Sequence, residues 1–209
     1  TGVEMAGAIA ELVRVMHKDY PDLDPQDIQV VLLEAMDRLL AHLTIDSSQS
    51  TLNALARKSV QVRLNTMVKS YDGCVIQLSE NQQLPSNTLI WAAGVQAASL
   101  VRELSQEKLP QNRIKVLPTL QIPQDERVFL IGDAAYLLDQ NGQALPMVAP
   151  VAMQQAELAV KNLIRLIQSE PLQPFHYKDM GSRATIGRNQ DVAEMFGVRL
   201  HGWQAWLVW

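Results

Sequence analysis

The chain has 209 residues, of which 47% are apolar, and its formal net charge at pH 7 is −4. A chain of this size can bury the core of one large domain or two small ones, so the composition excludes a disordered protein. The acidic balance argues against a nucleic-acid-binding protein, which usually carries a basic excess.

The chain contains one cysteine, Cys74. A disulfide, a redox pair and a multi-cysteine metal site within this chain are therefore excluded. The histidines show no metal-ligand spacing, so no metal site is expected. No apolar run reaches the roughly 20 residues of a membrane-spanning helix.

The first elements are predicted to be a helix, a loop and a strand. Val3, Ala6 and Ala10 recur at helical spacing within a helix over residues 2–18. A polar link with two prolines covers residues 19–27. "IQVVLLEA" follows, and its nearly continuous apolar run is typical of a strand buried on both faces of a parallel sheet.

The rest of the chain is predicted as shorter elements up to one long helix. An amphipathic helix is expected over residues 149–167, with Pro150 in the first turn, where its missing N–H costs nothing. The tail from residue 175 is expected to be irregular. The other predicted elements are helices over 51–59 and 97–105 and strands over 60–64, 66–71, 74–78, 87–94 and 127–135.

A helix followed by a strand with an acidic end indicates a dinucleotide-binding unit. Gly2 would be the third glycine of G-x-G-x-x-G, which allows a helix to pack closely on a strand. The first strand and the other two glycines would precede Thr1. We therefore expect this chain to be a fragment of a longer one.

Several stretches occur in one order: "TGVEMAGAIAEL", "VVLLEA", "LIWAAGV", "VFLIGDAA", "APVAMQQA" and "GSRATIGRN". Together they resemble the type II NADH:quinone oxidoreductases, which are single-subunit flavoproteins. The resemblance covers essentially the whole chain. It implies an α/β fold with two Rossmann-like dinucleotide-binding domains, incomplete here because the amino-terminal flavin-binding segment is absent.

The resemblance also implies a domain order. Residues 1–90 would bind NADH, and residues 91–170 would form the carboxy-terminal part of the FAD-binding domain. Residues 171–209 would lead into a helix at the membrane interface.

Two glutamates are candidates for the NADH site. Glu34 ends the predicted strand and can accept hydrogen bonds from the adenosine ribose hydroxyls. Its charge would repel the extra phosphate of NADPH by up to ~4 kcal/mol at a separation of about 4 Å and an effective dielectric constant near 20. The resemblance places Glu4 beside the nicotinamide and the flavin, where it could relay a proton. The alternatives are a surface glutamate for Glu34 and an ordinary first-turn acid for Glu4.

The resemblance implies three parts of a flavin site. Asp133, after Gly132, would bind the ribityl chain of FAD, and the loop at Ala93 and Gly94 would lie near the nicotinamide and flavin. The helix amino end would face the flavin pyrimidine edge and stabilise negative charge there. That end consists of Ala149, Pro150 and Val151. Turn-forming roles for Asp133 and Gly94 remain open.

The family pattern at this helix is Ala-Gln-x-Ala-x-Gln, next to the quinone site. Pro150 replaces the first glutamine, whereas Gln154 is retained and is a candidate catalytic residue. The replacement affects quinone binding more than flavin binding. The alternative is that Gln154 and Gln155 are ordinary polar residues of a helix.

The tail places Trp203, Trp206 and Trp209 three residues apart. Tryptophan favours the membrane–water interface, so this segment could begin a peripheral anchor at the cytoplasmic face of a membrane. A helix packed on the protein itself, or on a second subunit in a homodimer, is the alternative.

The resemblance implies electron transfer from NADH through FAD to a membrane quinone, without proton pumping. The alternatives are a reductase of a quinone biosynthetic intermediate, another pyridine nucleotide-disulfide-type oxidoreductase, and a non-catalytic nucleotide-binding fragment. The 209 residues alone are expected to be inactive.

Overall fold

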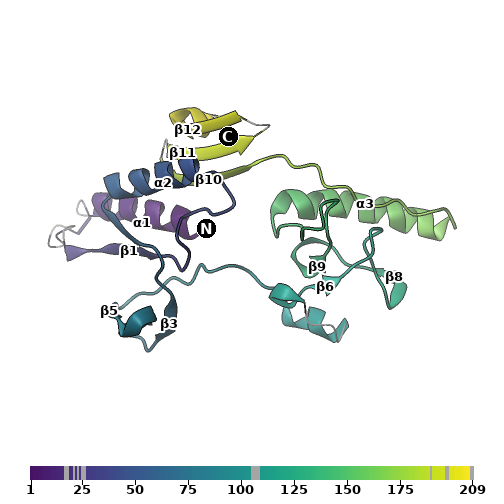
Figure 1. Cartoon of the computed structure of the whole chain (residues 1–209), viewed down its shortest axis with the longest axis horizontal. Helices are drawn as coiled ribbons and strands as arrows, with labels where there is room; N and C mark the ends of the chain where they lie inside the picture. The colour runs from purple at the N-terminus through teal and green to yellow at the C-terminus, as the bar shows by residue number, and fades with distance from the viewer. Residues whose placement is uncertain are drawn as a thin grey trace. The chain divides into compact units, whose positions relative to one another are not determined.

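The computed structural model describes residues 1–16, 19–20, 22, 24, 27–104, 109–188, 190–195 and 198–207. The chain divides into two compact units (Figure 1). The first unit combines residues 1–93 with residues 181–209, and the second unit contains residues 94–180.

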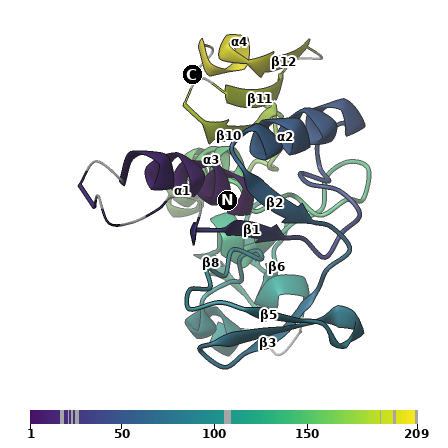
Figure 2. The same ribbon diagram turned by 90° about the vertical axis from the view of Figure 1, so that its left-hand side faces the viewer.

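The first unit has three layers. Helices α1 and α2 lie between the β1–β2 pair and the β10–β12 sheet (Figure 2). Its helices are α1 (Gly2–Met16), α2 (Ile45–Arg57) and α4 (Trp203–Leu207), together with the 3-10 helix η2 (Ser79–Asn81). Its strands are β1 (Val30–Leu33), β2 (Val60–Arg63), β3 (Val68–Tyr71), β4 (Val75–Leu78), β5 (Gln83–Pro85), β10 (Ser182–Gly187), β11 (Gln190–Met195) and β12 (Val198–Gly202).

The sheets of the first unit differ in direction. Strands β1 and β2 are parallel, with Val30 opposite Val60 and Leu33 opposite Arg63. The β3–β4–β5 and β10–β11–β12 sheets are antiparallel. The core between the layers consists of Val3, Ala6, Ala10, Leu39, Leu43, Ala54, Leu55, Val60, Ala184, Ile186 and Val192.

Helix α1 approaches β10 closely at Gly7. A Cβ atom added at Gly7 would lie 2.0 Å from the carbonyl oxygen of Ile186, so only glycine fits there. The sequence predicted this role for Gly2. A Cβ atom at Gly2 would instead make an ordinary contact, 3.6 Å from Leu32 Cδ1.

The second unit is built around α3 (Ala149–Ile167), which covers a core of Val116, Leu120, Ala135, Leu137, Leu145, Val151 and Phe175. Strands β6 and β9 pair in parallel, and β7 and β8 are antiparallel. The strands of this unit are β6 (Ile114–Lys115), β7 (Gln121–Ile122), β8 (Asp125–Phe129) and β9 (Ala135–Tyr136). Its 3-10 helices are η3 (Ser99–Leu104), η4 (Pro110–Asn112) and η5 (Gly132–Ala134).

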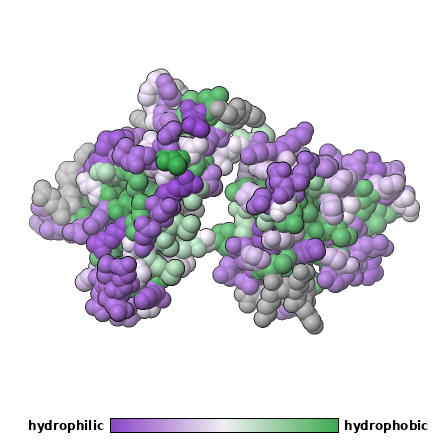
Figure 3. Space-filling view, viewed as in Figure 1, coloured by the Kyte–Doolittle hydropathy of each residue, from purple (hydrophilic) through white to green (hydrophobic). Residues whose placement is uncertain are grey.

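One side of α3 is apolar and exposed. Figure 3 shows apolar surface interrupting the polar surface of the second unit. The exposed apolar side chains of α3 are Met153, Val160, Leu163, Ile164 and Ile167.

Several sequence predictions about the elements are confirmed. Helix α3 has the predicted bounds, and α1 ends at Met16, with residues 17–18 outside the described part of the chain. The parallel pairing of β1 is also confirmed.

Other predictions are wrong. Residues 87–94 form no strand, because no described strand pairs with them. Strand β1 is only half-buried, and β2 is its one partner among the described strands. Helix α2 begins at Ile45 rather than at residue 51, and β8 ends at Phe129 rather than at residue 135.

The tail is irregular over residues 175–181, but the prediction is wrong from Ser182, where β10 begins. Its alternating residues Ala184 and Ile186 face the core under α1 and α2, and this burial stabilises the β10–β12 sheet.

Candidate functional site

In the first unit, backbone hydrogen bonds fix Glu34 just beyond β1. Its N–H donates to the Arg63 carbonyl at 2.9 Å, and its carbonyl accepts from the Thr66 N–H at 2.8 Å. The carboxylate Oε1 accepts from the Met36 N–H at 2.9 Å. A carboxylate has about four acceptor positions, so this arrangement leaves room for ligand hydroxyl groups.

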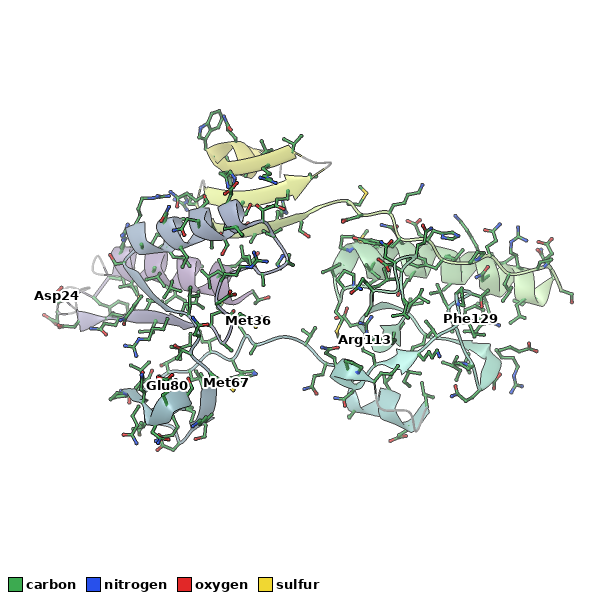
Figure 4. The ribbon with its side chains drawn as sticks, in the orientation of Figure 1. Asp24, Met36, Met67, Glu80, Arg113 and Phe129 are labelled. Carbon is green, nitrogen blue, oxygen red and sulfur yellow. The ribbon has the colours of Figure 1, made fainter. Side chains whose placement is uncertain are left out.

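Two methionines border the same end of the sheet. Met36 and Met67 are 57% and 59% exposed, and the loops that carry them are joined by a hydrogen bond from the Asn65 N–H to the Met36 carbonyl. Figure 4 labels both side chains in this region. An apolar thioether beside a carboxylate suits a ligand that has a flat ring and hydroxyl groups. Sequence reasoning missed both residues, because each lies in a loop with no motif.

The amino end of α1, which carries Gly2 and Glu4, lies close to Ala92. A Cβ atom at Gly2 would lie 3.7 Å from the Cβ atom of Ala92, the neighbour of Ala93. The Glu4 side chain is 46% exposed, so a ligand at this helix end could reach it. Gly94 has a φ of 89°, which explains the glycine, and an added Cβ atom would meet open space.

A buried carboxyl group lies on β11 near this helix end. Asp191 is 1% exposed and pairs with Thr185 across the sheet. Burial raises the pKa of Asp191, the nearby Thr185 hydroxyl and Arg183 charge lower it, and the charge of Glu4 raises it again. The pKa of Asp191 is raised overall, mainly because the group is buried.

In the second unit, Gly132 begins the η5 turn with a φ of 66°, a conformation that favours glycine. Asp133 follows it and is exposed. The Gly132 N–H donates to Oε1 of Gln155 on α3 at 2.7 Å, so the turn and the helix are joined. This arrangement leaves the Asp133 carboxylate accessible to a ligand.

The amino end of α3 offers few N–H donors. Pro150 has none, and the Val151 N–H donates to the Val148 carbonyl at 3.1 Å. The Val151 side chain is buried in the core, so only its backbone could contact a ligand. Ala149 is the first residue of the helix. A ligand at this end would therefore meet mainly the positive end of the helix dipole.

The Gln154 side chain makes two hydrogen bonds with the backbone of Lys178. Its Nε2 donates to the Lys178 carbonyl and its Oε1 accepts from the Lys178 N–H, both at 3.0 Å. Asn162, two turns later, makes the same pair of bonds with the backbone of Gln173, each at 2.8 Å. Two amide side chains of α3 thus hold residues 171–178, which we call the strap.

A buried cation braces the chain next to the Asp133 turn. The Arg113 side chain is 4% exposed and donates to the carbonyls of Ala135 and Leu145 (Figure 4). Its guanidinium lies 5.2 Å from the centre of the Tyr136 ring. Burial lowers the pKa of Arg113, and the neighbouring Tyr136 and Asp133 partly offset this shift. Arg113 thereby joins β9 to the segment that leads into α3.

The described residues include neither a membrane-spanning helix nor a metal-binding cluster. No helix among them is long and apolar enough to cross a membrane. Within the same part of the chain, no three histidine, cysteine, aspartate or glutamate side chains are grouped as metal ligands would be.

Solved structures show the same fold. An NDH2 structure from Plasmodium falciparum in complex with NADH superposes with a TM-score of 0.84 and 18% identity, covering 99% of this chain and 58% of that chain. A sulfide:quinone oxidoreductase from Aquifex aeolicus gives a TM-score of 0.68 and 11% identity, covering 96% of this chain and 52% of that chain.

Curated relatives are similar along nearly the whole chain. The type II NADH:quinone oxidoreductase Ndh of Mycobacterium tuberculosis is 33% identical over 221 residues, covering 100% of this chain and 47% of the relative. The type II NADH:quinone oxidoreductase of Haemophilus influenzae is 30% identical over 188 residues, covering 89% of this chain and 42% of the relative. The chain thus spans about half the length of the curated relatives it matches.

The family model of pyridine nucleotide-disulphide oxidoreductases matches residues 1–156, which is most of the chain. The motifs had predicted relatives of the type II NADH:quinone oxidoreductase kind, and this prediction is confirmed. The chain belongs to the pyridine nucleotide-disulphide oxidoreductase family.

Proposed function

We propose that the full-length protein, with this chain extended to the length of its relatives, passes electrons from NADH through FAD to a quinone. The observation that carries this proposal is the 33% identity to a type II NADH:quinone oxidoreductase, which covers the whole chain. The order of the motifs, from the α1 segment to the α3 segment, supports the same reaction.

The first unit supplies the NADH site. Glu34 accepts hydrogen bonds from the ribose hydroxyls of the adenosine, and Met36 and Met67 contact the adenine ring. Gly2 and Glu4, at the amino end of α1, lie toward the nicotinamide together with Ala93 and Gly94. Met36 and Met67 are exposed, which supports their assignment to the adenine ring.

The second unit supplies part of the FAD site, and its residues fit that group. Asp133 is exposed and can accept hydrogen bonds from ribityl hydroxyls. Gln155 Nε2 is a buried donor without a partner among the described residues, as expected beside a site for a polar group. Bound FAD would supply the two-electron chemistry. Ala149, Pro150 and Val151 direct the positive end of the α3 dipole toward it.

The domain assignment follows from these sites. Residues 1–90 form the NADH-binding domain, and residues 91–170 form part of the FAD-binding domain. The division between Ala93 and Gly94 supports the first boundary. Residues 171–209 lead toward the membrane interface, and residues 181–209 pack with the first unit.

The quinone assignment rests on α3, and the membrane assignment rests on α4. Gln154 lies on the quinone side of α3 and orders the strap through Lys178. Trp203 and Trp206 are exposed on α4, which supports peripheral contact with a membrane, and we assign this contact to the cytoplasmic face. Trp209 lies outside the described residues. A homodimer is the alternative use of the tryptophan surface.

Steady-state oxidation of NADH by the purified, FAD-loaded full-length protein tests the proposal. Consumption of NADH should require a short-chain quinone and should be slow with NADPH. A rate of NADH oxidation that does not depend on the quinone would contradict the assigned acceptor and favour a reductase with another acceptor.

A further inference from the structure

A buried amide on α3 holds the turn that precedes Asp133. The Gln155 side chain is 0% exposed, and its Oε1 accepts from the Gly132 N–H at 2.7 Å. A backbone N–H can only donate, so the carbonyl oxygen of the amide must face Gly132 and the NH₂ group must face away. The orientation of Gln155 is therefore chemically determined.

The same amide is costly to bury. Its Nε2 has no hydrogen-bond partner among the residues that the structure describes. An unsatisfied buried donor destabilises a protein relative to an apolar side chain of the same shape. A methionine would remove this donor but also the acceptor of the Gly132 N–H, so what the amide adds over an apolar side chain is a bond that fixes the position of the turn.

The turn is close to α3 at this point and is held from its other side as well. A Cβ atom added at Gly132 would lie 3.5 Å from the Cβ atom of Ala152. Beyond Asp133, Arg113 donates to the carbonyls of Ala135 and Leu145. Gln155 fixes the Gly132 end of the turn, and Arg113 fixes the Ala135 end.

We propose that Gln155 is a positioning residue for the flavin. It sets the Gly132–Asp133 turn against α3, so that the Asp133 carboxylate and the amino end of α3 contact one FAD molecule together. This inference rests on the proposed function, because it assumes that FAD binds at Asp133.

The test compares two buried amides of the same helix in the full-length protein. Q155M keeps the shape of the side chain and removes its hydrogen bonds. N162D is the control, because Asn162 is also 0% exposed but bonds to Thr119 and Gln173 rather than to the turn. Each variant is assayed for thermal unfolding of the apoprotein, for the Kd of FAD and for the flavin midpoint potential.

Q155M should raise the Kd of FAD at least tenfold and shift the midpoint potential. N162D should lower the Tm but leave the Kd of FAD within about twofold of the wild type. If Q155M does not fold, Q155N replaces it, because the shorter amide cannot reach Gly132 in the same geometry and should weaken FAD binding similarly.

Unchanged FAD affinity and potential in the Gln155 variant would overturn the inference. So would an equal loss of FAD affinity in N162D, since the effect would then be one of general stability. A wild-type protein that binds no FAD would instead overturn the proposed function, which separates the two failures.

Discussion

At the scale of single residues, the charge of Glu34 is the feature that should select NADH over NADPH. The substitution Glu34→Gln keeps an acceptor for the Met36 N–H and removes only the charge. We expect the preference for NADH, measured as the ratio of the kcat/KM values for the two nucleotides, to fall at least tenfold, which corresponds to about 1.4 kcal/mol.

The exposed Glu157 on α3 offers a control with the same change of charge. Glu157→Gln should leave the nucleotide ratio unchanged. An unchanged ratio in Glu34→Gln would remove the specificity role assigned to Glu34.

The packing around Gly7 leaves no room for a side chain. Gly7→Ala would place a Cβ atom 2.0 Å from the Ile186 carbonyl oxygen, so α1 and β10 would have to separate. We expect the free energy of unfolding, measured by urea denaturation, to fall by at least about 2 kcal/mol. Gly2→Ala, in the same helix but with ordinary contacts, should change it by less than about 1 kcal/mol. Equal effects of the two substitutions would contradict the close approach.

At the scale of elements, a carboxylate from a distant strand caps α2. Glu194 Oε1 on β11 accepts from the Thr44 N–H at 2.9 Å, the Thr44 hydroxyl at 2.5 Å and the Ser47 hydroxyl at 2.6 Å. Burial alone would raise the pKa of Glu194, but the bonds from Ser47 and Thr44 outweigh it and lower the pKa. The anion also lies at the positive end of the helix dipole.

Because the folded-state pKa is lowered, this stabilisation is present above the ordinary glutamate pKa of 4.5 and is lost as the pH falls through the folded-state value. Glu194→Gln should cost about 1 kcal/mol of unfolding free energy at pH 7. The difference from the wild type should disappear in acid, where Glu194 is protonated. A difference that persists unchanged at low pH would show that charge is not the cause.

The strap provides a second test at this scale. Gln154→Ala removes both bonds to the Lys178 backbone, so the Lys178 amide should exchange with deuterium at least tenfold faster. The Gln173 amide, which Asn162 holds, should keep its exchange rate in the same sample. If the Lys178 amide exchanges no faster, Gln154 does not hold the strap.

The elements that sequence predicted well are those with a strong helical period and a clear start. The spacing of the apolar residues predicts α1. Pro150 in the first turn marks the start of α3. Helix α2 begins earlier than predicted, because its first turn is polar and its N-cap Thr44 is held by Glu194, about 150 residues away in sequence.

The candidate site was predictable only where a motif marks a residue. Glu34 and Asp133 stand at the ends of apolar runs and are exposed or half-exposed as a ligand site requires. The contacts of Gln154 and Gln155 could not be predicted, because neighbouring glutamines of one helix contact different parts of the fold, the strap and the Gly132 turn. Close packing at Gly7 rather than Gly2 depends on β10, whose alternating pattern was not recognised as a strand.

At the scale of the whole molecule, most residues proposed for NADH and those proposed for FAD belong to different units of the chain. It spans about half the length of its curated relatives, and α3 exposes an apolar side. The electron transfer proposed above is therefore to be measured on a protein of the relatives' full length.

The most direct measurement is an anaerobic titration of the full-length protein with NADH, followed by a short-chain quinone, while the flavin absorbance is recorded. NADH should bleach the oxidised flavin band with one NADH per flavin, and the quinone should restore it. A flavin that NADH bleaches but quinone does not restore would contradict the proposed acceptor. A purified protein without any flavin band would contradict the proposed chemistry altogether.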